Sequence, residues 1–204
     1  MTETNAEADR HREKMAKRKA VQDAEVAAKT VTQKGLLIVH TGPGKGKSTA
    51  AFGLALRALG HGWKVGVVQF IKGAWDPGEK HAFAAFGDKV VWRAMGEGFT
   101  WETQDRARDI AAAEAAWRVA QDMMADPDIR LVVLDELNIA LRYDYLPLDE
   151  TVAALAHRRE GLHVVATGRN AKPALIEAAD LVTEFVAVKH HFAAGIKGQQ
   201  GVEF

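Results

Sequence analysis

A glycine-rich stretch offers the clearest chemistry in this sequence. It reads Thr41-Gly42-Pro43-Gly44-Lys45-Gly46-Lys47-Ser48-Thr49 and stands between an apolar run and a helix-forming run. In such a strand–loop–helix context, glycines let backbone N–H groups point inward at a phosphate, and the helix adds the positive end of its dipole. Lys47 brings a mobile cation, and Ser48 offers a hydroxyl to Mg²⁺. The stretch predicts a site for the phosphates of ATP, with each of these residues a candidate contact.

The spacing of this loop departs from the usual pattern, which is G-x-x-x-x-G-K-S/T. Counting back from Gly46, the first position is held by Thr41, and Gly42 is one residue too close. Either Thr41 fills that position or the loop is one residue shorter, which would shift the phosphate chain. A glycine-rich turn without a ligand is the plain alternative. A dinucleotide fingerprint fits poorly, because Lys47 stands where its third glycine would be.

Two acids stand at the end of another apolar run. Residues 131–134 are Leu-Val-Val-Leu, and Asp135 and Glu136 follow. In proteins with a phosphate-binding loop, an acid at this place holds Mg²⁺ directly or through water. By itself the pair is common, and helix capping before Asn138 would also explain it. Together with the loop it indicates a magnesium–nucleotide site in which Ser48 and Glu136 contact the metal and Asp135 lies close by.

Two arginines are secondary candidates for neutralising a phosphate. Arg169 follows the carboxyl end of a predicted strand, where parallel sheets place their ligands. Arg57 lies about three helical turns beyond the loop. A surface charge on a helix explains Arg57 as well as a phosphate contact does.

An aromatic segment, Phe99-Thr100-Trp101, is flanked by glycine at Gly96 and Gly98. Two large aromatic side chains on such a loop are costly if exposed. They either fill the core or face a flat apolar ligand. Physical chemistry alone slightly favours the core.

From Gly35 onward the chain alternates predicted strands and helices. Strands are predicted at 36–40, 64–71, 89–93, 129–134, 162–166 and 181–186, and helices at 47–59, 103–124, 149–158 and 172–179. Nearly continuous apolar strands suit a sheet covered on both faces. The alternation predicts a three-layer α/β fold with a mostly parallel sheet. Together with the glycine-rich loop at 41–49, it predicts the P-loop NTPase (RecA-like) class. Residues 72–80 are expected to form a loop, and residues 188–204 an ordered wrap.

Residues 1–34 differ from the rest in composition. Residues 10–19 are highly charged and strongly helix-forming, and Val21 and Val31 belong to a thin apolar stripe that follows. We predict a separate helical arm, with the catalytic domain at 35–204. A solvated or frayed helix fits this pattern, and so does an arm that packs on another subunit or over a site.

The composition excludes several classes of protein. The 204 residues include 27 Lys plus Arg, 27 Asp plus Glu and no cysteine. The balanced charge argues against a general nucleic-acid partner. The lack of cysteine removes disulfides, thiolate metal sites and cysteine nucleophiles. The N-terminus lacks the apolar core of a signal peptide, and no apolar run approaches the length of a membrane span. We therefore expect a cytoplasmic protein without membrane or nucleic-acid partners.

Several motifs together resemble those of the P-loop-type corrinoid (cobalamin) adenosyltransferases. They are TGPGKGKSTAAFG, VGVVQFIKG, GEGFTWETQ, VVLDEL followed by YDYLPL, TGRN, and VKHHFAAGIKGQQGVEF. The loop and the acid pair are shared by many families, whereas GFTWETQ and the C-terminal motif are specific to this one. The resemblance covers residues 10–204, arm included.

The resemblance implies that the 5′-deoxyadenosyl group of ATP is transferred to the cobalt of a reduced corrinoid, with release of triphosphate, in adenosylcobalamin biosynthesis or salvage. It implies ATP, Mg²⁺ and a corrinoid, with Lys47 stabilising the leaving group. Phe99, Thr100 and Trp101 would face the corrinoid. Phe99 and Trp101 would displace its lower axial ligand, so that the cobalt is reduced more easily. The arm would cover the partner's site in a homodimer, and a flavin-dependent donor would supply electrons.

Two other functions fit the loop and the acid pair without the resemblance. One is a RecA-like ATPase or kinase, in which Glu136 could serve as the base for phosphoryl transfer. The other is a nucleotide-sensing module whose aromatic segment and arm dock a partner. The products separate these hypotheses, since only the transferase releases triphosphate.

Overall fold

The computed structural model describes residues 3–31, 34–71, 77–95 and 105–203. Phe99, Thr100 and Trp101 lie outside the described residues. The chain divides into two compact units, Met1–Lys34 and Gly35–Phe204.

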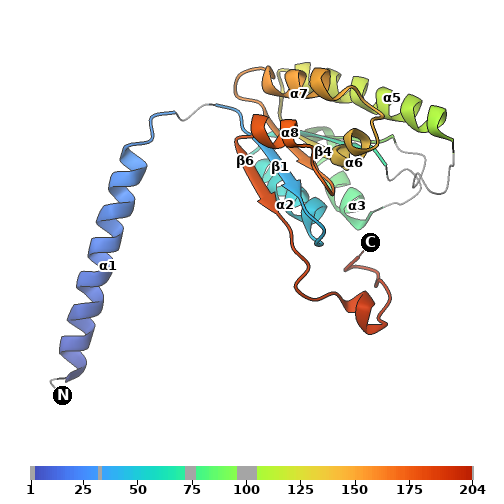
Figure 1. The fold of residues 1–204 in the computed structure, drawn as a ribbon. Coiled ribbons are helices and arrows are strands. Elements are labelled where there is room, and N and C mark those ends of the chain that lie inside the picture. Colours follow the sequence, from blue (N-terminus) through green and yellow to red (C-terminus); the bar gives the residue numbers. More distant parts are fainter. Residues whose placement is uncertain (1–2, 32–33, 72–76, 96–104, 204) are drawn as a thin grey trace. The chain divides into compact units, whose positions relative to one another are not determined.

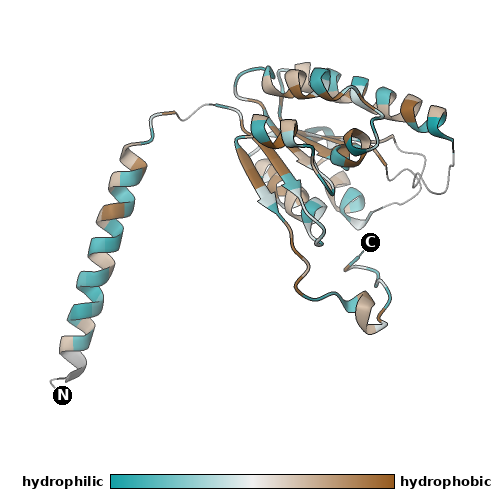
Figure 2. Cartoon of the chain, viewed as in Figure 1, coloured by the Kyte–Doolittle hydropathy of each residue, from teal (hydrophilic) through white to brown (hydrophobic). Residues whose placement is uncertain are grey.

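The first unit is built on one long helix, α1 (Glu3–Ala27). Strong helix formers and ion pairs between neighbouring turns, such as Lys19–Asp23 at 2.5 Å, account for it. Val21 and Val26 are exposed along with the charged side chains. Figure 2 shows that hydrophilic residues predominate along α1, so this helix has no wide apolar face of its own.

A parallel sheet forms the centre of the second unit (Figure 1). Its strands are β1 (Leu37–Thr41), β2 (Lys64–Gln69), β3 (Val90–Ala94), β4 (Ile129–Asp135), β5 (His163–Thr167) and β6 (Leu181–Glu184). Their order is β3-β2-β4-β5-β1-β6, and each neighbouring pair in this sheet is parallel. The carboxyl ends of the strands therefore meet at one edge, where ligands of such sheets bind. The α/β fold with a mostly parallel sheet, predicted from the sequence, is confirmed.

Helices cover both faces of this sheet, which makes three layers (Figure 1). They are α2 (Lys47–Gly60), α3 (Gly78–Ala84), α5 (Arg106–Ala125), α6 (Leu137–Arg142), α7 (Leu148–Ala156) and α8 (Pro173–Ala178). On one face, Phe52 of α2 packs in a cluster with Val65 and Val67 of β2. On the other, Leu141 of α6 shares a cluster with Val68. Successive residues of a strand enter opposite clusters because strand side chains alternate between faces.

Two helices differ from the sequence prediction. Helix α3 begins at Gly78, inside the predicted loop, because Pro77 is extended and starts the turn while Phe83 is buried. Helix α6 follows the acid pair, where no helix was predicted. Its side chains Leu137 and Leu141 are fully buried. Both helices are too short to show a helical period, so tertiary burial decides their formation.

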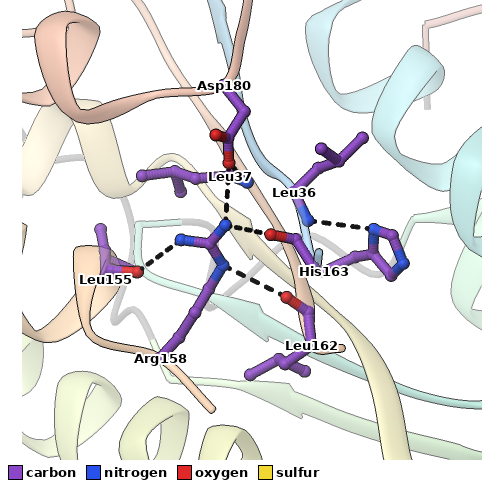
Figure 3. A network of polar contacts seen from close by, with 8 residues as sticks. Leu36, Leu37, Leu155, Arg158, Leu162, His163 and Asp180 are labelled. Carbon is purple, nitrogen blue, oxygen red and sulfur yellow. Dashed lines mark hydrogen bonds and ion pairs between the residues drawn. The ribbon is translucent and has the colours of Figure 1, made fainter. Parts of the chain in front are cut away.

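A buried arginine fixes the amino edge of the sheet (Figure 3). Arg158 donates hydrogen bonds to the carbonyl of Leu162 at 3.2 Å and to the carbonyl of Gly35. Its guanidinium also pairs at 2.9 Å with Asp180, which accepts the N–H of Leu37 at 2.9 Å. A Cβ atom at residue 35 would lie 2.0 Å from the oxygen of Leu162, so only glycine fits there. These contacts fix the register of β1. The glycine-rich stretch at residues 41–49, called the phosphate loop below, begins at the opposite end of this strand.

Candidate active site

The phosphate loop turns sharply between β1 and α2. Gly42 and Gly46 have positive φ angles of 95° and 104°, which glycine adopts without strain. The side chain of Lys47 is buried, and its ammonium donates to the carbonyls of Gly42 at 2.9 Å and Gly44 at 2.5 Å. The loop thus curls around the charge of Lys47, which is placed to meet the more strongly accepting oxygens of a phosphate.

The chain just after β6 covers one flank of this loop. Phe185 donates its N–H to the carbonyl of Thr41 at 2.9 Å, and its carbonyl accepts the N–H of Gly44 at 2.7 Å. A Cβ atom at Gly44 would lie 2.7 Å from the Phe185 backbone. Pro43 has no N–H, and that of Gly44 is engaged. The next N–H groups along the chain belong to the start of α2, which begins at Lys47 and carries the positive end of the helix dipole.

A histidine lies beneath the loop. The ring of buried His40 meets that of Phe185 edge-on at 5.3 Å, and its Nδ1 lies 3.1 Å from the carbonyl of Lys47. Burial lowers the pKa of His40 below its ordinary value near 6.5, and the bond to this carbonyl raises it in part. His40 is therefore neutral at pH 7 and donates from Nδ1. It supports the loop and is not placed as a proton acceptor for substrate.

The acid pair lies beside the start of α2. Asp135 is fully buried, and its Oδ1 accepts hydrogen bonds from Ser48 Oγ at 2.6 Å and from Thr167 Oγ1 at 2.8 Å. Its Oδ2 accepts a hydrogen bond from Gln69 Nε2 at 3.1 Å. Glu136 has a positive φ of 64°, and its N–H donates to Thr167 at 3.0 Å. The left-handed turn at Glu136 separates the two carboxylates, so that one is buried and the other half-buried.

The oxygens gathered here fit a magnesium ion. Ser48 supplies a hydroxyl already oriented by Asp135, and Glu136 follows at the rim. Across the described ranges, no group of three or more His, Cys, Asp or Glu is placed to hold a metal by itself. Magnesium at nucleotide sites is usually bound by one or two protein oxygens together with substrate phosphates and water.

The other predicted contacts fall into two groups. Thr41 accepts the N–H of Ala171 at 3.0 Å, which ties the segment carrying exposed Arg169 to the phosphate loop. Thr49 is exposed in the first turn of α2. Arg57 is exposed near the far end of α2, about 15 Å along the helix from Lys47. The structure thus does not bring Arg57 together with the loop of its own chain.

The C-terminal segment also reaches the loop. Lys45 forms an ion pair with Glu203, and His191 lies 3.8 Å from the same carboxylate. A short 3-10 helix, His191–Ala194, precedes this contact. The segment is therefore ordered but mostly not helical.

Sequence reasoning missed several residues of the site. Gln69 and Thr167 donate to Asp135, and Phe185 bonds to the backbone of Thr41 and Gly44. Each contact spans a long stretch of sequence, so no local pattern could have indicated it. The one available signal was their place at the carboxyl ends of strands predicted to be parallel.

The chain is similar to proteins with a known activity. A family model described as ATP:corrinoid adenosyltransferase BtuR/CobO/CobP matches residues 33–204, and one described as Cob(I)alamin adenosyltransferase N terminal matches residues 1–26. A corrinoid adenosyltransferase of Pseudomonas aeruginosa is 59% identical over 100% of both chains. One of Sinorhizobium sp is 55% identical over 99% of this chain and 96% of the relative. Corrinoid adenosyltransferase CobA of Salmonella typhimurium is 47% identical over 96% and 98%.

The family model spans both the phosphate loop and the acid pair, and the N-terminal model covers most of α1. The match to the Pseudomonas relative runs the full length of both chains. The chain belongs to the ATP:corrinoid adenosyltransferase family.

Proposed function

We propose that this enzyme joins the C5′ carbon of ATP to the cobalt of a reduced corrinoid and releases triphosphate. The Co(I) centre supplies the electron pair of the new Co–C bond and becomes formally Co(III). The C5′–O bond breaks, and its electron pair leaves with the triphosphate. The family assignment supports this reaction.

The contacts of Lys47 are the observation that carries the proposal at the level of the site. Its buried ammonium lies inside the loop, against the carbonyls of Gly42 and Gly44 and at the start of α2. The ammonium and the start of α2 stabilise negative charge, and the charge that grows in this reaction is on the leaving triphosphate. A loop that holds the leaving group firmly leaves the sugar end of ATP as the reacting end.

The nearby acid–base groups are consistent with a nucleophile that needs no deprotonation. His40 is neutral, and its Nδ1 bonds to a main-chain carbonyl. Asp135 accepts hydrogen bonds from Ser48, Gln69 and Thr167. Both serve the shape of the loop. Because Co(I) attacks with its own electron pair, alignment of the reactants accounts for most of the required catalysis.

We also assign Mg²⁺ to Ser48, with Glu136 and Asp135 at its side. When bound there, the ion would neutralise charge on the phosphates. Ser48 can offer its oxygen lone pairs because its proton is donated to Asp135.

Phe99, Thr100 and Trp101 are proposed to face the corrinoid, on the strength of the sequence resemblance. The Phe99→Ala, Trp101→Ala double variant should lose nearly all adenosylation that starts from Co(II), while its ATP affinity stays near that of the wild type. Isothermal titration calorimetry with ATP provides the control. Equal losses of both would instead mean that the two rings fill the core.

The arm is proposed to act as a lid over the partner's site in a homodimer. The match of a family N-terminal model to residues 1–26 supports a functional arm, and α1 leaves Val21 and Val26 exposed. A flavin-dependent electron donor and a cytoplasmic location complete the proposal. Removing residues 1–27 should reduce turnover without changing ATP binding. Analytical ultracentrifugation of the full chain tests the dimer.

Product analysis tests the reaction itself. Incubation with ATP and a chemically reduced corrinoid should yield a light-sensitive Co–C product and one triphosphate for each corrinoid consumed. Formation of ADP and phosphate with no alkylated corrinoid would overturn the proposal.

A further inference from the structure

Gln69 is a buried amide at the carboxyl end of β2, and it contacts the acid of the site directly. It is 1% exposed, its Nε2 donates to Asp135 Oδ2 at 3.1 Å, and its Oε1 accepts the indole N–H of Trp92 at 3.1 Å. An indole N–H can only donate. Trp92 therefore determines which end of the amide faces Asp135, and that end is the donor.

This donor is part of the hydrogen-bonded environment of a fully buried carboxylate. Ser48 and Thr167 both donate to Oδ1 of Asp135, so the amide of Gln69 is the partner shown for Oδ2. Without it, Oδ2 would lose a hydrogen bond in a buried place, which is costly. The carboxyl group could then rotate toward other donors, and the short bond from Ser48 would be lost or lengthened.

The backbone of Gln69 strengthens this arrangement. In the sheet, Gln69 is paired with Asp135 on one side and with Ala94 on the other. Its carbonyl also accepts the N–H of Met95 at 3.0 Å. The residue that orients the acid is therefore held on both sides by neighbouring strands, and its main chain cannot shift without disturbing β3.

We propose that Gln69 is a positioning residue for the magnesium–triphosphate site, acting through Asp135 on the hydroxyl of Ser48. Because the hydroxyl of Ser48 donates its hydrogen bond to Asp135, the oxygen lone pairs of Ser48 can point toward the metal. Trp92 acts indirectly, because its indole N–H orients the amide of Gln69. This inference rests on the proposed binding of ATP with Mg²⁺, and it does not depend on which bond of ATP is broken.

The test is the Mg²⁺ concentration that gives half-maximal ATP binding, measured by calorimetry on the full-length protein without corrinoid. In Gln69→Leu it should rise about 10- to 100-fold, the usual cost of losing a group that orients a metal ligand. ATP binding in excess chelator should match the wild type. In Trp92→Phe the Mg²⁺ requirement should rise by a smaller factor, because the amide remains but is no longer oriented.

A matched control separates positioning from stability. Leu155 is fully buried in α7, away from the acid pair, so Leu155→Ala should lower the melting temperature while leaving the Mg²⁺ requirement unchanged. A wild-type Mg²⁺ requirement in Gln69→Leu, or an equal rise in Leu155→Ala, overturns the proposal. If Gln69→Leu does not fold, Trp92→Phe decides alone: a raised requirement supports the proposal and an unchanged one overturns it.

The same assay keeps this inference apart from the proposed reaction. If ATP is cleaved to ADP but the Gln69 effect on Mg²⁺ is found, the reaction assignment fails and the positioning role stands. If adenosylation is found but Gln69→Leu binds Mg²⁺ and ATP as the wild type does, the reaction stands and the positioning role fails.

Discussion

Ser48 Oγ donates a 2.6 Å hydrogen bond to Asp135 Oδ1, which joins the first turn of α2 to the end of β4. Helix α2 follows β1 through the phosphate loop, and β1 is not a neighbour of β4, because β5 lies between them. Thr167 of β5 fills the gap by donating to the same carboxylate oxygen at 2.8 Å. The phosphate loop is therefore fastened to the centre of the sheet, and the triphosphate proposed to bind there would have a rigid support.

Lys47→Met should reduce the rate of adenosylation from Co(I) by about 100- to 1000-fold, the usual effect of removing one donor to a developing negative charge. The methionine fills most of the same buried space but cannot donate to the carbonyls of Gly42 and Gly44, so a modest fall in the melting temperature should accompany the loss of rate. Single-turnover measurements of Co–C product give the rate. Lys89 is an exposed lysine in the 3-10 helix Gly87–Lys89. The Lys89→Met variant is therefore the control and should retain wild-type rates. A comparable loss in both variants would contradict this role.

Gly44→Ala should weaken ATP binding and destabilise the fold by about 1–3 kcal/mol, because the added methyl meets the Phe185 backbone at 2.7 Å. The loop or the chain after β6 must move to admit it. Gly53→Ala is the matched control, because a Cβ atom added at Gly53 would meet nothing within 4 Å outside the backbone of its own helix. Gly53 is exposed and lies in the middle of α2. That variant should gain about 0.5–1 kcal/mol. Thermal unfolding and ATP titration measure both, and a stable, tightly binding Gly44→Ala would refute the close contact.

Glu203→Gln should tighten ATP binding by about two- to fivefold, consistent with the modest size of exposed ion pairs. The carboxylate pairs with Lys45 of the phosphate loop, and its negative charge opposes an incoming triphosphate. The effect should shrink at high ionic strength because salt screens it. Glu177→Gln, which removes an exposed acid on α8, should leave the affinity unchanged. Weaker binding by Glu203→Gln would mean that Glu203 instead helps to hold Lys45 in place for the nucleotide.

The stability of the protein should fall as the pH is lowered below about 6.5. Burial, followed by the charges of Arg130 and Arg158, lowers the pKa of His163 below its ordinary value near 6.5. The folded chain then binds fewer protons than the unfolded chain, so the free energy of unfolding decreases as protons become available. The bond that His163 Nδ1 accepts from Leu36 N–H at 3.2 Å is lost on protonation of that nitrogen.

His163→Asn removes the titrating ring but keeps an acceptor near Leu36. Its denaturant midpoint should depend less on pH than that of the wild type as the pH falls below about 6.5, because the asparagine does not titrate. Part of the dependence should persist, because burial also lowers the pKa of His40. An unchanged pH profile in His163→Asn would show that His163 does not contribute.

Local patterns were enough to predict most of the fold. Short stretches of chain contain the apolar runs, the glycine spacing and the alternation of strands and helices. These patterns can therefore be recognised in the sequence without knowledge of the tertiary structure. Helices α3 and α6 were missed because each is too short to show a period and owes its existence to buried side chains such as Phe83 and Leu141.

The sequence by itself determined the phosphate loop, the acid pair and the class of fold, since the residues of each motif are neighbours along the chain. The tertiary structure decided which side chains surround them. Gln69 lies 66 residues from Asp135, and Glu203 lies 158 residues from Lys45. Such contacts exist only once parallel strands bring their carboxyl ends to one edge. The same geometry leaves Arg57 at the far end of α2, because an α-helix carries a residue ten positions on about 15 Å away.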